Sequence, residues 1–400
     1  GGHLGGFTVG SVPDMLLWTP DGSRVLVANE GERQSNAVNP AGGVSIISFN
    51  AGNASASSVN TIGFAAWDGQ EAALRAQGVR IQAGVAASIA LEPEYIALSQ
   101  DGKTAIVTLQ ENNALAFVDL QTQQITQIKS LGLKDFSLPG NAIDPSDQDG
   151  KIELRPVPVK GLYMPDAIVG FGVGGQSFYA MANEGDAFVD DSDIIRFGNA
   201  VVTLNAAVFP NAAELKSNAK LGRLNIVRDG ATGDGGISNM SEIVTLGGRS
   251  FSIRDAQGNL VYDSGNLLEA KAIELGLYAD GRSDDKGVEP EGIIVFELAG
   301  RQIAAVGLER TTRGAVALFD VSDPANTSFL QMLDSGSTAD VRVEGLLAFE
   351  FGGQFYLALA SEDPSNITTL YRVSAVPEPA SVALMAGGLM AIGALRRRRA

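Results

Sequence analysis

The chain has 400 residues, of which 45% are hydrophobic and 19% charged, with 48 glycines and no cysteine. This composition is typical of a globular protein, and the lack of cysteine excludes disulfides, thiolate zinc sites and a cysteine nucleophile. The one histidine, His3, lies in a glycine-rich start. Histidine triads and histidine-bound metals are therefore excluded from the body of the chain. Any chemistry must use carboxylates, hydroxyls, Arg or Lys, or a bound hard metal.

The formal net charge is −17, from 46 acidic and 29 basic residues. A surface this acidic repels nucleic acid and anionic lipid and favours cations or neutral partners. We therefore expect no nucleic-acid partner. The alternative is that the charge serves only solubility outside the cell.

A pair of β-rich runs joined by a glycine-bearing turn, the signal of a β-hairpin, is repeated along the chain. The five copies begin near Pro13, Pro93, Pro165, Pro290 and Val343. Their irregular spacing, roughly 50 to 125 residues, is typical of a β-propeller with loop insertions. We predict an all-β propeller with about six or seven blades, seven preferred. A two-sheet sandwich is the alternative.

Three other segments refine this prediction. The hairpin at 251–263 is interpreted as a sixth blade, and a seventh would come from a piece missing at a truncated N-terminus. Residues 123–160 and 187–250 are interpreted as insertions, with a short helix starting near Pro210.

Each copy has one acid where its first run begins and another where its second run ends. In a propeller, equivalent positions form rings, so these acids would line one mouth of the central channel, whereas a sandwich would scatter them. The acids that open the first runs are Asp14, Glu94, Asp166, Glu291 and Glu344. Those that close the second runs are Glu30, Glu32, Glu111, Glu184, Asp186, Glu309 and Glu362.

Crowded carboxylates raise one another's pKa unless a cation neutralises them. Oxygen ligands without His or Cys favour Ca²⁺ or Mg²⁺, and we expect Ca²⁺ outside a cell. The alternative is that each acid caps backbone N–H groups or pairs with Arg. The candidate metal ligands are Asp14, Glu30, Glu94, Glu111, Asp166, Glu184, Asp186, Glu291, Glu309 and Glu344.

Two acidic loops are separate candidates. Residues 144–152 partly match a calcium-binding loop, but prolines at its first and twelfth positions favour an Asp-rich turn. In the loop 282–291, Arg282 and Lys286 could bind phosphate oxygens and are the candidate catalytic residues. A solvated salt-bridge loop is the alternative.

The C-terminus carries Pro377, Glu378 and Pro379, then the uncharged segment 380–395, then Arg396, Arg397, Arg398 and Arg399. An apolar segment closed by arginines is typical of a short transmembrane helix with its basic end in the cytoplasm, which places the body outside. A helix packed on the body is the alternative. We therefore divide the chain into a body, residues 1–373, and a tail, residues 374–400.

The order of motif, apolar segment and basic cluster resembles the PEP-CTERM sorting signal of Gram-negative bacteria that make exopolysaccharide. The resemblance implies recognition by an exosortase, cleavage near the Pro-Glu-Pro motif, and membrane attachment through 380–395 before processing. It also implies an address in the cell envelope or the extracellular matrix.

Several long motifs of the body, including residues 13–32, 91–120, 135–166, 182–186, 249–265 and 282–292, resemble the choice-of-anchor I family. The resemblance covers most of residues 10–373 and implies an exported propeller similar to those of secreted calcium-dependent phosphatases and phytases. Our first hypothesis is a Ca²⁺-binding surface or matrix protein with a binding role, with exopolysaccharide among its potential partners. The alternative is a metal-dependent phosphoesterase of alkaline phosphatase or phytase type, in which the metal would do most of the work because no nucleophile with a neighbouring base is visible.

Overall fold

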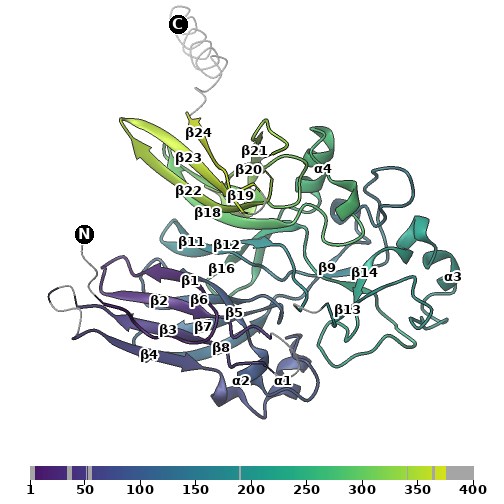
Figure 1. Cartoon of the computed structure of the whole chain (residues 1–400), viewed down its shortest axis with the longest axis horizontal. Helices are drawn as coiled ribbons and strands as arrows, with labels where there is room; N and C mark the ends of the chain where they lie inside the picture. Colours follow the sequence, from purple (N-terminus) through teal and green to yellow (C-terminus); the bar gives the residue numbers. More distant parts are fainter. Residues whose placement is uncertain are drawn as a thin grey trace, which may run out of the picture.

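The computed structural model describes residues 5–33, 38–50, 52, 56–188, 191–339, 341–362 and 365–374. The described chain is dominated by antiparallel strands, with a few short helices (Figure 1). The all-β prediction is confirmed. The predicted helix at 380–395 and the sorting residues of the tail lie outside the described residues, and none of the described helices is long and apolar enough to cross a membrane.

Five antiparallel sheets correspond to the five sequence repeats, and four of them have four strands while the fifth has three. The first comprises β1 (Pro13–Trp18), β2 (Arg24–Asn29), β3 (Gly43–Ser48) and β4 (Ser58–Gly63). The second comprises β5 (Pro93–Leu98), β6 (Thr104–Leu109), β7 (Ala114–Asp119) and β8 (Gln124–Ser130). The third comprises β11 (Ile168–Val173), β12 (Gln176–Asn183), β16 (Ser250–Asp255) and β17 (Leu260–Asp263). The fourth comprises β18 (Pro290–Leu298), β19 (Arg301–Leu308), β20 (Ala315–Asp320) and β21 (Ser328–Asp334), and the fifth comprises β22 (Val343–Phe351), β23 (Gln354–Ser361) and β24 (Thr368–Val373).

The first strands of successive sheets lie next to one another. Strand β1 contacts β5, β5 contacts β11, β11 contacts β18, and β18 contacts β22. The sheets therefore follow one another in chain order, from the purple first sheet to the yellow fifth sheet in Figure 1. None of the sheets closes on itself in the part of the chain that is described.

The predicted count of six or seven blades is not met, because the described strands form five repeat sheets. The hairpin at 251–263 is not a separate blade. It supplies β16 and β17, and β16 pairs with β12 over Phe178↔Asp255 to Asn183↔Ser250. A long insertion between the second and third strands of this sheet made its outer hairpin look independent in the sequence.

The insertions form a side lobe with its own core, built around Phe136, Phe197 and Ile226. The predicted insertion at 123–160 begins later than expected, because 124–130 form β8. The short helix expected after Pro210 is α3 (Ala212–Leu215). The lobe and its surroundings also contain β9 (Leu133–Asp135), β10 (Lys160–Leu162), β13 (Ile194–Arg196), β14 (Asn225–Val227) and β15 (Val244–Thr245). Helices α1 (Glu71–Ala76) and α2 (Ala87–Ala90) pack on the core between the first and second sheets, and α4 (Leu267–Glu274) packs on the core between the third and fourth sheets. Other helical turns are Ala65–Trp67, Pro139–Asn141, Asn218–Gly222, Asp280–Arg282 and Pro324–Asn326.

A separate apolar cluster joins each pair of neighbouring sheets. Between the third and fourth sheets, for example, the rings of Phe251 and Phe319 are 4.4 Å apart at their centroids. Burying one such side chain contributes about 1.5–3 kcal/mol. Packing of each sheet against the next thus fixes the order of the sheets in space and brings their first strands together.

Candidate functional site

Antiparallel pairing places the repeated acids at one end of the sheets. In each sheet the start of the first strand pairs with the end of the second, as in Pro13↔Asn29 and Pro290↔Leu308. The opening acid and the closing acid therefore lie at the same end, and the adjacency of the first strands gathers them across sheets. We call this end of the molecule the acidic mouth. It comprises the strand-opening and strand-closing acids together with Glu92 and Glu289.

Four of the five opening acids lie at a break in the strand register. The pairing shifts between Pro13 and Leu16, Pro93 and Ile96, Pro290 and Ile293, and Val343 and Gly345. An extra residue in one strand bends it locally and re-aims a side chain. Four of the five opening acids also have a residue of positive φ two positions before them, namely Val12, Met164, Glu289 and Arg342. The local sequence thus holds the acids in an irregular backbone.

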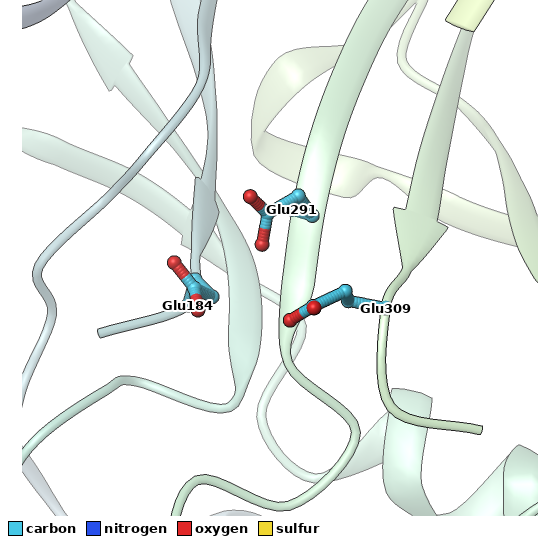
Figure 2. Close-up of side chains that lie close together, drawn as sticks. All are labelled: Glu184, Glu291 and Glu309. Atoms are coloured by element: carbon cyan, nitrogen blue, oxygen red, sulfur yellow. The ribbon is translucent and has the colours of Figure 1, made fainter. Parts of the chain in front are cut away.

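Three carboxylates from the third and fourth sheets come closest together. Glu184 follows β12, Glu291 lies in β18 and Glu309 follows β19. One carboxylate oxygen of each lies within 4.8 Å of the other two. Figure 2 shows their side chains directed toward a common space. We call these residues the glutamate trio.

Burial and mutual repulsion both act on the glutamate trio. Burial raises the pKa of Glu291 to about 12, with further increases from Glu184, Asp166 and Glu309. Burial likewise raises the pKa of Glu184 to about 8, although Lys286 opposes the shift. The Oε2 atom of Glu291 is buried and accepts no hydrogen bond from any described residue. Without an added cation, at least one member of the trio is protonated at neutral pH.

A second set of acids extends the mouth toward the first and second sheets. Burial, followed by the charge of Glu111, raises the pKa of Glu94 well above its ordinary value. Burial raises the pKa of Glu111 in the same direction and that of Glu30 to about 8. Glu94 and Glu111 are only 9% and 7% exposed, and the Oε2 atom of each has no hydrogen-bond partner in the described chain.

Basic side chains partly neutralise the mouth. The Nζ of Lys286 lies 2.7 Å from Glu184 Oε1 and 3.1 Å from Glu289 Oε2. Arg310 and Arg342 lie 2.8 and 3.2 Å from Glu309, and Arg282 lies 2.6 Å from Glu289. Arg282 and Lys286, singled out as phosphate ligands from the sequence, thus already form ion pairs with carboxylates.

A family model for the choice-of-anchor I domain matches residues 1–324. The chain belongs to the choice-of-anchor I family. A second model, for the PEP-CTERM protein-sorting motif, matches residues 375–399. This motif implies exosortase-type sorting machinery, export, and a location at the bacterial cell surface. Both sequence resemblances are confirmed.

A curated relative, Gigasin-3a of Magallana gigas, is 26% identical over 140 residues, which cover 31% of this chain and 48% of that protein. The chain thus matches about half of that relative's length. Among solved structures, the periplasmic gluconolactonase PpgL of Pseudomonas aeruginosa aligns with 12% identity and a TM-score of 0.37 over 90% of this chain and 72% of that chain. The β-propeller domain of Myceliophteria thermophila Cps50 (Swd1) aligns with 9% identity and a TM-score of 0.35, covering 93% and 88% of the two chains. At these TM-scores neither structure carries an inference about activity.

Two residues of the candidate site in this choice-of-anchor I chain were missed in the sequence. Glu92 and Glu289 each directly precede the proline before an opening acid. Glu289 is fully buried and lies within ion-pair distance of Arg282, Lys286 and Arg310. Burial raises the pKa of Glu92 to about 8. The Glu-Pro-Glu sequence shared by 92–94 and 289–291 was the signal that could have identified both.

The acidic loop at 144–152 is an arginine-paired turn, as the proline positions indicated. Asp147 pairs with Arg223 at 2.8 Å, and Asp149 pairs with Arg155 at 2.6 Å. Asp144 accepts hydrogen bonds from the backbone of Ser146 and Glu153. These contacts leave the loop's carboxylates in local structural roles.

Proposed function

We propose that this exported choice-of-anchor I protein is a Ca²⁺-binding surface protein whose five sheets act as propeller blades around a metal-holding mouth. The observation that carries the proposal is the glutamate trio, with oxygens within 4.8 Å of one another. Oxygen ligands lie about 2.3–2.6 Å from Ca²⁺, so oxygens on opposite sides of one ion are separated by up to about 5 Å. One ion can therefore contact all three carboxylates.

The unpaired buried oxygens support the same proposal. Glu94, Glu111 and Glu291 each hold a buried Oε2 that accepts no hydrogen bond within the described residues. A buried polar atom without a partner costs about 1–3 kcal/mol, and more when it is charged. A bound cation, with the water it carries, would remove this cost and the mutual repulsion together.

Ca²⁺ fits this donor set better than Mg²⁺ does. The trio supplies three carboxylates from two neighbouring sheets. Ca²⁺ accepts six to eight oxygen ligands in flexible geometry, whereas Mg²⁺ requires nearly ideal octahedral geometry at about 2.0–2.1 Å. A surface location also exposes the site to an environment in which we expect Ca²⁺ to be available. The remaining acids, Asp14, Glu30, Asp166, Asp186 and Glu344, would complete the outer part of the mouth.

We propose a binding or scaffold role for this metal-loaded body, with a component of the bacterial surface, such as exopolysaccharide, as its partner. Metal-dependent phosphoester hydrolysis is the alternative raised by the sequence. Arg282 and Lys286 are occupied by Glu289 and Glu184, so no contact in the described chain favours that alternative.

Thermal unfolding of the full chain tests the proposal, after treatment with EDTA and then with added Ca²⁺ or Mg²⁺. We expect a concentration-dependent rise in melting temperature that is larger with Ca²⁺ and is reversed by chelator. The same samples are assayed for hydrolysis of a generic phosphomonoester, for which we expect no chelator-sensitive turnover. Unchanged melting with both ions would refute Ca²⁺ binding, and chelator-sensitive turnover would establish the alternative.

A further inference from the structure

A buried lysine lies outside the acidic mouth and takes no part in the proposed metal site. Lys134, in β9, is only 3% exposed. Its Nζ lies 2.9 Å from Oδ1 of Asp263, the last residue of β17, and donates a hydrogen bond to the backbone oxygen of Gly265 at 2.8 Å. Strand β9 belongs to the three-stranded sheet β15-β10-β9, and β17 belongs to the third repeat sheet. The contact therefore joins two different sheets.

The carboxyl group of Asp263 has fixed donors at both of its oxygens. The hydroxyl of Ser250 donates a hydrogen bond to Oδ2 at 2.8 Å, and the backbone N–H of Gly265 donates one to Oδ1 at 2.7 Å. Fixed donors of this kind stabilise the negative charge that develops on carboxyl oxygens when a nucleophile adds to the carbon. The structure thus places an amine against a carboxyl group that is polarised for addition.

Glu269, in α4, supplies a third buried group to this cluster. It is fully buried, and its Oε2 atom accepts no hydrogen bond from any described residue. Burial raises the pKa of Glu269, although the charges of Arg249 and Lys134 oppose the shift. A buried carboxyl group with an unused oxygen is suited to accept a proton and to return it during a reaction.

The surroundings of Lys134 favour its neutral, nucleophilic form. Burial lowers the pKa of Lys134, although the charge of Asp263 opposes the shift. Lys286, which is also buried, shows the contrast. Burial lowers its pKa too, but the acids around it, led by Glu184, raise that pKa well above its ordinary value. Other charged or titratable groups around the cluster are Arg249, Arg254, Tyr163, Tyr278 and Asp144.

We propose that Lys134 and Asp263 form an intramolecular amide bond, which links the two sheets covalently in this chain without cysteine. The Nζ of neutral Lys134 attacks Cγ of the protonated Asp263 side chain, and a C–N bond forms. Glu269 accepts a proton from the nitrogen and delivers it to one carboxyl oxygen of Asp263, which leaves as water. The ammonium and carboxylate groups of the ion pair thus become one amide and one water molecule, with no oxidant or reductant.

This inference is independent of the proposed metal function, because none of the three residues belongs to the acidic mouth. Formation of the amide also removes two charges from a buried position, where an ion pair carries a desolvation cost.

The mass of the purified full chain, measured after unfolding, tests the inference. It should be lower than the mass calculated from the sequence by one water, about 18 Da. Trypsin does not cleave after an acylated lysine, so a digest should contain residues 130–151 joined to residues 255–271 as one branched peptide. The full calculated mass, together with cleavage after Lys134, would overturn the inference. This measurement needs no variant, so it decides the inference even where a variant fails to fold.

An exposed pair in the same sheet provides the matched control. Lys160 lies 2.5 Å from Asp135, but their side chains are 33% and 32% exposed. Water keeps both groups charged, so we expect ordinary cleavage after Lys160 and an unchanged mass loss in Lys160→Arg. Lys134→Arg should abolish the mass loss, because a guanidinium group stays charged. An amide between Lys160 and Asp135 would show that proximity alone suffices and would contradict the role given to burial.

The role of Glu269 is tested with a variant of the same shape. Glu269→Gln cannot carry a proton and should leave the chain at its full calculated mass, whereas Glu269→Asp should restore part of the mass loss. A melting transition like that of Lys134→Arg would show that Glu269→Gln is folded. A complete amide bond in Glu269→Gln would refute Glu269 as the proton carrier.

Discussion

Replacing Glu291 with Gln should affect the Ca²⁺-bound state of the acidic mouth much more than the metal-free state. Burial and the neighbouring acids raise the pKa of Glu291 to about 12, so its carboxyl group is neutral at pH 7 when no cation is bound. Gln has the same shape and is also neutral. We therefore expect the metal-free free energy of unfolding to change by less than about 0.5 kcal/mol.

The same substitution should weaken Ca²⁺ binding, because an amide is a poorer ligand than a carboxylate. A ligand present at 100 times its Kd stabilises the folded state by about 2.7 kcal/mol. If Glu291→Gln raises the Kd tenfold, the same Ca²⁺ concentration contributes only about 1.4 kcal/mol. The variant should thus lose about half of the Ca²⁺-induced stabilisation.

The assay is chemical unfolding of the full chain with EDTA and with a fixed Ca²⁺ concentration. Glu297→Gln is the matched control, because Glu297 lies in the same strand, β18, but is exposed and outside the trio. The control should behave as the unmodified chain does. A large loss of stability in EDTA, or full Ca²⁺ stabilisation in the Glu291→Gln variant, would refute this reasoning.

Three further outcomes follow from the same contacts. Folding raises the pKa of Glu92 and Glu184 from 4.5 to about 8, so the stability that these groups contribute is complete below pH 4.5 and is lost as the pH rises toward 8, at up to about 1.4 kcal/mol per pH unit for each group. Unfolding of the EDTA-treated chain at pH 5 and at pH 8 checks this prediction. Greater stability at pH 8 would contradict it. Lys286→Met should destabilise the metal-free chain by about 3–5 kcal/mol in urea unfolding, because it removes the ammonium group that pairs with the fully buried Glu289 and with Glu184. Unchanged stability would show that these pairs are dispensable. Gly185→Ala should lower the melting temperature by several degrees, since φ is +87° and the new Cβ would lie 2.2 Å from the backbone nitrogen of Gly247. Gly174→Ala is the control, because Gly174 also has a positive φ but faces open space. Equal effects of the two substitutions would exclude the steric explanation.

The repeated hairpins could be predicted from the sequence because each is a local pattern of alternating β-rich runs and glycine turns. Their grouping into sheets could not be predicted fully. Strands β12 and β16 pair although more than sixty residues separate them along the chain, and no local signal specifies such a partner. The sixth-blade interpretation failed at this point, since the hairpin of β16 and β17 has the same local pattern as a separate repeat.

The convergence of the acids was predictable because identical positions in repeated hairpins occupy equivalent places. The distribution of their partners was not. The sequence left Lys286 and Arg282 either as phosphate ligands or as members of a salt-bridge loop, and in three dimensions they pair with Glu184 and Glu289. The ion pairs of a buried acid depend on which side chains lie near it in space. Glu289, for example, lies near Arg282 and Lys286 from the same loop and near Arg310 from beyond the next strand.

Isothermal titration of Ca²⁺ into the EDTA-treated full chain tests the central claim most directly, when it is repeated in buffers of different ionisation enthalpy. The raised pKa values of Glu184 and Glu291 mean that Ca²⁺ must displace protons from the acidic mouth. We expect saturable binding whose apparent enthalpy changes with the buffer, as proton release requires. Absence of binding, or binding without proton release, would contradict the account.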